Sequence, residues 1–110
     1  MYPGMRCKFN REELKALCKV LQVSLHCFML EDENEMFKYA MKDCIDEMQL
    51  RFAKKLVMNK CAYAIMFKPM EVWSLMVLIN RDWLDCYPYE RNLADILLSE
   101  FNKFQVNLIN

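Results

Sequence analysis

His26 and Cys27 are the residues whose types best suit chemistry, because an imidazole can activate a neighbouring thiol as a nucleophile. Such a pair needs hydrogen-bond contact, and adjacent side chains on a helix point about 100° apart. The positions that share a helix face with His26 are neither nucleophiles nor carboxylates: Gln22, Val23, Met29 and Leu30. The sequence therefore predicts no catalytic residues, and we expect a protein without enzymatic activity.

The six cysteines and the acidic run EDENE (31–35) are the other groups that could do chemistry, as metal ligands. The cysteines form no C-x-x-C pair, and a single histidine does not complete a zinc site. A calcium loop needs a glycine at its sharp turn, and the only glycine of the chain is Gly4. The same lack of glycine excludes the common phosphate-binding loops. We expect no metal and no cofactor.

Length and charge narrow the class of protein further. A chain of 110 residues fits one domain, and its formal net charge of zero gives no overall attraction to nucleic acid or to an anionic membrane. The longest apolar stretch is interrupted by Lys68, Pro69 and Glu71, so no membrane span is expected. The first residues, MYPGMRCKFN, lack the apolar core of a signal peptide. We therefore expect a cytoplasmic protein with free thiols.

Hydrophobic periodicity predicts two long helices in the first half of the chain. Residues 1–9 are expected to form a flexible lead-in, broken at Pro3-Gly4. Asn10 and Glu13 form a capping box that starts a helix at Arg11, and Asp32 or Asn34 caps a second helix that ends near Asn59. Apolar residues recur at helical spacing in both: Leu14, Leu17, Cys18, Leu21, Leu25 and Phe28, then Phe37, Met41, Cys44, Ile45, Met48, Phe52 and Leu56.

From Cys61 the spacing changes to that of a short strand, about residues 61–67, between the second and third helices. Two x-Pro-x-Glu sequences, residues 68–71 and 87–90, then start two further helices, because proline suits the first helical position. The third helix is apolar almost all round and is expected to be the most buried. The fourth has an apolar stripe of Leu93, Ile96, Leu97, Phe101 and Phe104, and the tail QVNLIN is expected to be loose or weakly extended.

These elements make the predicted fold class mainly α, a single four-helix domain over 1–110 with one short strand. A lone strand leaves backbone groups unpaired, so it needs a partner. This partner could be the tail at 106–109, another protein or the same segment of a second copy of the chain. We expect a homodimer or an unknown protein partner, and a non-catalytic accessory or regulatory subunit. The expected contact residues are Tyr63, Ile65 and Phe67, with Trp83 and Tyr87 nearby.

The succession of strand, Pro-Glu helix start, loop and helix in 61–104 is similar to the ribbon-helix-helix repressors. The resemblance implies a dimer that pairs its strands and reads the major groove with the outer side chains of the ribbon. Both faces of the predicted strand are apolar here, whereas base reading needs polar side chains. A nucleic-acid-binding regulator is therefore the alternative function, and its phosphate contacts would come from Arg51, Lys54, Lys55, Lys60 and Lys68.

Overall fold

The computed structural model describes residues 4–79 and 81–109, and in 104–109 the backbone alone. Within these ranges the chain forms four α-helices, a two-stranded antiparallel sheet and a short 3-10 turn at Asp82–Leu84, so the mainly-α prediction is confirmed. The elements are β1 (Met5–Phe9), α1 (Arg11–Met29), α2 (Glu35–Val57), β2 (Tyr63–Phe67), α3 (Pro69–Ile79) and α4 (Pro88–Ile109).

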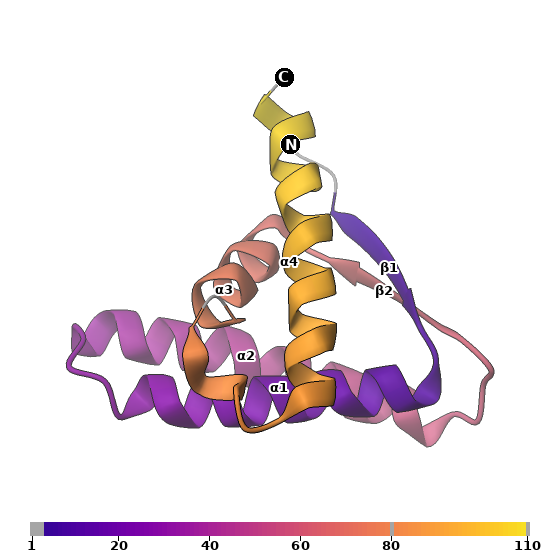
Figure 1. Ribbon diagram of the computed structural model, residues 1–110, viewed down its shortest axis with the longest axis horizontal. Coiled ribbons are helices and arrows are strands. Elements are labelled where there is room, and N and C mark those ends of the chain that lie inside the picture. The colour runs from indigo at the N-terminus through magenta and orange to yellow at the C-terminus, as the bar shows by residue number, and fades with distance from the viewer. Residues whose placement is uncertain (1–3, 80, 110) are drawn as a thin grey trace.

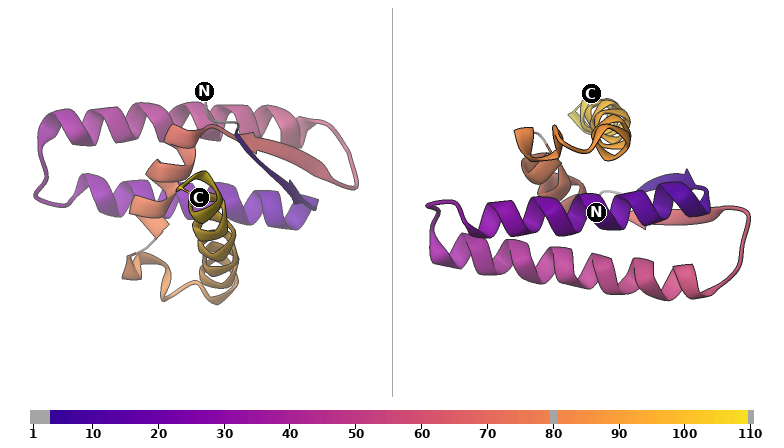
Figure 2. Two further views of the ribbon diagram at one scale, coloured as in Figure 1. Left: turned by 90° about the horizontal axis from the view of Figure 1, so that it is seen from above. Right: turned by 60° about the horizontal axis from the view of Figure 1, so that its bottom comes forward.

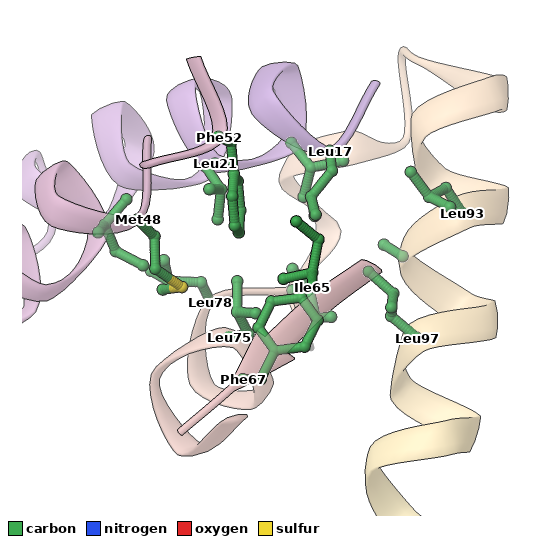
Figure 3. Packing of buried hydrophobic residues seen from close by; sticks show 14 of the residues in the cluster. Leu17, Leu21, Met48, Phe52, Ile65, Phe67, Leu75, Leu78, Leu93 and Leu97 are labelled. Atoms are coloured by element: carbon green, nitrogen blue, oxygen red, sulfur yellow. The ribbon is translucent and has the colours of Figure 1, made fainter. Parts of the chain in front are cut away.

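The two longest helices, α1 and α2, lie antiparallel and side by side in one layer (Figures 1 and 2). The second layer, on one side of the first, contains α3, α4 and the two strands, and α4 crosses α1 steeply (Figure 1). The apolar side chains of five elements meet between the layers, as Figure 3 shows: Leu17, Leu21, Met48, Phe52, Ile65, Phe67, Leu75, Leu78, Leu93 and Leu97.

The β2 strand pairs inside the chain, but with residues 5–9 and not with the tail at 106–109 that the sequence analysis offered as an internal partner. Met5–Phe9 form β1, which pairs antiparallel with β2 from Met5 opposite Phe67 to Phe9 opposite Tyr63. The prediction of a flexible lead-in is therefore wrong for residues 5–9. Met5, Cys7 and Phe9 alternate with charged residues, and this period of two was the available signal.

Gly4 shows how closely the chain approaches the end of β2. A Cβ atom added at Gly4 would lie 2.7 Å from the Phe67 carbonyl oxygen and 2.8 Å from Met66 Sδ. Any larger residue would push the start of β1 away from its partner. The single glycine of the chain thus permits a close backbone contact.

All four helices start where local signals predicted. The Asn10 side chain accepts from Glu13 N and the Glu13 carboxylate accepts from Asn10 N, both at 2.8 Å, which completes the capping box. Asn34 caps α2 by accepting from Phe37 N at 3.2 Å. Both x-Pro-x-Glu sequences place proline at the first helical position, at Pro69 and Pro88.

Two features of the last helices differ from the prediction. The tail continues α4 as helix to Ile109, so its described residues are neither loose nor extended. Ile96, assigned to the buried stripe, is 56% exposed, and in α3 Trp73 is 44% exposed. An apolar residue at a helix edge is buried only where another element covers it, and the described residues leave Ile96 and part of Trp73 uncovered.

Candidate functional site: an apolar groove between α2 and α3

A groove lined almost entirely by apolar surface runs between α2 and α3. Its volume is about 290 Å³, and its lining residues are Phe37, Ala40, Met41, Cys44, Met70, Trp73 and Ser74. Methionine and aromatic side chains dominate this lining, and flexible thioethers let such a surface adapt to the shape of an apolar partner. We call it the α2–α3 groove.

Aromatic contacts fix the shape of the α2–α3 groove. The Phe37 ring meets the Trp73 ring edge to face with centroids 5.8 Å apart, and meets Phe28 of the core in the same way at 5.5 Å. Such pairs stabilise their geometry by about 0.5–1.5 kcal/mol beyond the area that they bury. Trp73 is therefore held in place on one side while its other side faces solvent.

Exposed apolar side chains extend the groove at its edges. Met36 lies one helical turn before Ala40 and is 79% exposed, and Met70 at the start of α3 is 63% exposed. The polar atoms of the groove are used internally, since Ser74 Oγ donates to Met70 O at 2.9 Å and lies 3.5 Å from Cys44 Sγ. A contiguous apolar surface with satisfied polar groups is typical of an interaction site.

The surroundings of the α2–α3 groove are acidic. Asp43 and Glu47 follow Ala40 on the same side of α2, and the run 31–35 ends at the first residue of this helix. Glu47 approaches Lys68 Nζ only to 4.0 Å, and Asp43 makes no ion pair within the described residues. Lys42 is bound to Asp46, whose hydrogen bond raises the pKa of Lys42. Negative charge therefore remains available beside the groove.

A buried ion pair anchors the α3 wall of the groove. The carboxylate of Glu71, only 5% exposed, accepts two hydrogen bonds from Arg51 of α2, at 2.8 and 3.1 Å. It also accepts from Lys68 N at 2.8 Å, which caps α3 as its sequence position predicted. The partner in α2 was missed, because the two residues are far apart in sequence.

The structure places three predicted contact residues in the core instead. The side chains of Tyr63, Ile65 and Phe67 are buried, and Figure 3 shows Ile65 and Phe67 pointing among the helices. The Phe67 ring packs edge to face on Phe52 at 6.1 Å and on Phe101 at 5.6 Å. The period of two in the strand places these three side chains on one face, and this face packs against the chain's own helices.

Trp83 and Tyr87, the other two predicted contact residues, are half-buried around a shallow hollow. The Trp83 ring packs on Phe28 at 6.3 Å, and Lys19 Nζ lies 4.3 Å from the centre of the Tyr87 ring. His26, Cys27 and Cys86 line the same hollow. No hydrogen bond joins the His26 imidazole to a thiol or carboxylate of the described chain.

The five basic residues of the alternative function occupy the end of α2 and both ends of β2. Arg51 is committed to Glu71, whereas Lys54 and Lys60 are exposed. The completed ribbon adds two basic side chains that the sequence analysis did not consider, since Arg6 pairs with Met66 and Lys8 with Ala64 on its exposed face.

No group of three or more His, Cys, Asp or Glu side chains among the described residues is placed to hold a metal ion. None of the helices, over the residues described, is both long and apolar enough to cross a membrane. No family model matches the sequence, and no curated protein or solved structure resembles it significantly.

The α2–α3 groove was missed by sequence reasoning, although a signal existed. Met36 and Tyr39 lie outside the apolar stripe that buries α2, and α3 has more apolar residues than one face can bury. More apolar residues than one helix face can bury indicate a second apolar surface, but they do not show between which elements this surface lies.

Proposed function

We propose that this chain is a non-catalytic protein–protein interaction domain, an accessory or regulatory subunit that receives a partner helix in the α2–α3 groove. The observation that supports it is the apolar lining of this groove with exposed Met36, Met70 and Trp73 at its edges. Two helices with an apolar channel between them suit an amphipathic helix, whose apolar side chains enter at helical spacing.

The partner helix is expected to be basic. Asp43, Glu47 and the run 31–35 supply carboxylates beside the groove, and Glu47 is only weakly paired, with Lys68 Nζ at 4.0 Å. Complementary charge at the rim accelerates association and selects among apolar partners. The six cysteines are free in the structure, which suits our proposal of a reducing cytoplasm as the compartment.

The test uses a designed amphipathic helix of leucine and lysine, labelled for fluorescence anisotropy. We expect a dissociation constant on the order of micromolar. Ala40→Arg places a long charged side chain in the groove and should weaken binding at least about tenfold. Ala53→Arg is the matched control, because Ala53 is also exposed on α2 but faces away from the groove. Absent binding, or equal losses in both variants, contradicts the proposal.

Self-association is measured in the same series. The expected homodimer relied on an unpaired β2, and β1 now occupies one edge of that strand. Light scattering across a dilution series would show a doubled mass if a second copy enters the groove, and Ala40→Arg would then restore the monomer. That result would mean that a second copy of the chain, and not a basic helix of another protein, occupies the α2–α3 groove.

Nucleic-acid binding is the alternative that we retain. It is supported by the exposed Lys54 and Lys60 and by Arg6 and Lys8 on the outer face of the ribbon. It predicts a duplex complex that weakens steeply with salt, because bound phosphates release counterions. A mixed DNA duplex pool that fails to bind at low salt would remove it.

A further inference from the structure

The second edge of the ribbon offers a different kind of binding surface. The sheet has two strands, and among the described residues β1 has β2 as its one neighbour. In an antiparallel pair every second residue directs its N–H and C=O away from the partner strand. The outer edge of β1 therefore presents backbone donors and acceptors that only an extended chain can pair in register.

A hollow follows this open edge. It is about 360 Å³ in volume and lies between β1 and α4, and Figure 2 shows β1 on the α4 side of β2. Four consecutive strand residues form one wall, so the hollow runs along the strand. Its lining is Arg6, Cys7, Lys8 and Phe9 on that wall, Leu93, Ile96, Leu97 and Glu100 on α4, and Glu13 beside them. We call it the β1–α4 groove.

The inner part of the β1–α4 groove is apolar. Ile96 is more than half exposed and no described element covers it, which makes it the residue with most apolar surface to lose on binding. Burial, and secondarily the negative charge of Glu100, raise the pKa of the Cys7 thiol, so this side chain is neutral at neutral pH. Cys7 therefore adds no charge to the surface that an apolar side chain would cover.

The charge at the outer rim is positive. Arg6 and Lys8 are exposed and form no ion pair within the described residues. The carboxylates nearby are occupied: Glu13 accepts from Asn10 N in the capping box, and Glu100 pairs with Lys103 at 3.3 Å. Carboxylates opposite Arg6 and Lys8 would form favourable cross-strand pairs.

The same charges argue against a second copy of the chain at this edge. Two antiparallel β1 strands centred on Cys7 would place Arg6 of each copy opposite Lys8 of the other. Like charges directly opposite destabilise strand pairing. In this register a second copy is disfavoured, and a strand of different composition fits the charges of the edge better.

We propose that the β1–α4 groove binds an extended segment of another protein, in which acidic and apolar residues alternate, as a third strand beside β1. Alternate side chains of a strand point to opposite faces. The apolar ones would enter the groove against Ile96, and the acidic ones would meet Arg6 and Lys8. This strand addition uses a surface separate from the α2–α3 groove and does not depend on that proposal.

The test uses a labelled short peptide in which glutamate alternates with valine, measured by fluorescence anisotropy with the full chain. Three control peptides are used: the same composition in two blocks, lysine in place of glutamate, and a methylated backbone nitrogen at the centre. We expect at least about tenfold weaker binding for all three. Equal binding of the block peptide or of the methylated peptide would overturn strand addition.

A charge-reversal pair completes the test. The double variant Arg6→Glu with Lys8→Glu should no longer bind the glutamate peptide and should bind the lysine peptide instead. The control double variant, Lys54→Glu with Lys60→Glu, changes lysines that are exposed elsewhere and should leave the affinity for both peptides unchanged. Circular dichroism confirms that each variant is folded. Should the first double variant keep its preference for the glutamate peptide, or should wild type bind a DNA duplex at low salt and neither peptide, the proposal is overturned.

Discussion

The two grooves differ in what they offer to a partner. The α2–α3 groove lies between helices, whose backbone groups are already paired, so it can recognise only side chains. The β1–α4 groove has an open strand edge along one wall, so it offers backbone hydrogen bonds as well as an apolar surface. One fold thus presents a surface for a helix and a surface for a strand.

The charges of the two grooves are opposite as well. Asp43 and Glu47 lie beside the α2–α3 groove, whereas Arg6 and Lys8 lie at the rim of the β1–α4 groove. A chain with zero net charge therefore has two local fields of opposite sign. Each groove should therefore select a different partner.

The largest effect is expected for Ile65→Asp, which acts beneath both grooves. Ile65 is fully buried in the core that positions α3 and α4, and a carboxylate there has no partner. We expect a loss of more than about 4 kcal/mol in the free energy of unfolding, measured by urea denaturation. Ala64→Asp, on the exposed face of β2, is the control and should change it by less than about 1 kcal/mol. A folded Ile65→Asp protein with altered mass would instead support a strand interface.

Glu71→Gln tests the wall of one groove alone. It leaves the Arg51 guanidinium without its carboxylate and should cost about 2–4 kcal/mol of unfolding free energy. Glu90→Gln at the second x-Pro-x-Glu start is the control, since Glu90 pairs with Lys19 at 3.3 Å and half of the lysine is exposed. We expect less than about 1 kcal/mol there. Equal costs would mean that the Arg51 pair contributes little.

Ala40→Arg and Ile96→Glu test whether the grooves are independent. Each should weaken its own peptide by roughly tenfold, because a charge enters an apolar lining, and leave the other peptide within about twofold. Anisotropy titrations of both peptides with both variants give the four dissociation constants that are compared. A loss of both peptides in either variant would show that the two sites are coupled.

Two cysteines allow the smallest effect to be measured in one sample. Cys44 lines the α2–α3 groove and Cys7 lines the β1–α4 groove. The thiolate is the reactive form, so the raised pKa of Cys7 should make its alkylation at neutral pH several-fold slower than that of exposed Cys61 or Cys86. Because the pKa of Cys7 is raised, its alkylation rate should continue to rise as the pH is taken above the ordinary pKa of a thiol.

Each peptide should then protect one thiol and not the other, as mass spectrometry of alkylated fragments would show. The helical peptide should protect Cys44, and the alternating peptide should protect Cys7. Protection of Cys7 by the helical peptide would contradict the assignment of the two partners.

The sequence alone determined where the helices begin and which residues of β2 share a face. These features depend on interactions within a few residues: the Asn10–Glu13 capping box, the Asn34 cap, and proline at the first helical position. Local hydrogen bonds and steric limits operate in any tertiary context, so these predictions were confirmed.

Only the tertiary structure decided which element covers each apolar face of the strands and helices. β1 is too short to be stable by itself and forms because β2, two helices later, pairs with it. The two x-Pro-x-Glu sequences look alike, yet Glu71 binds Arg51 while Glu90 binds Lys19. Likewise Ile65 is enclosed by helices and Ile96 is left open, because burial depends on which distant elements meet, and local sequence does not encode that meeting.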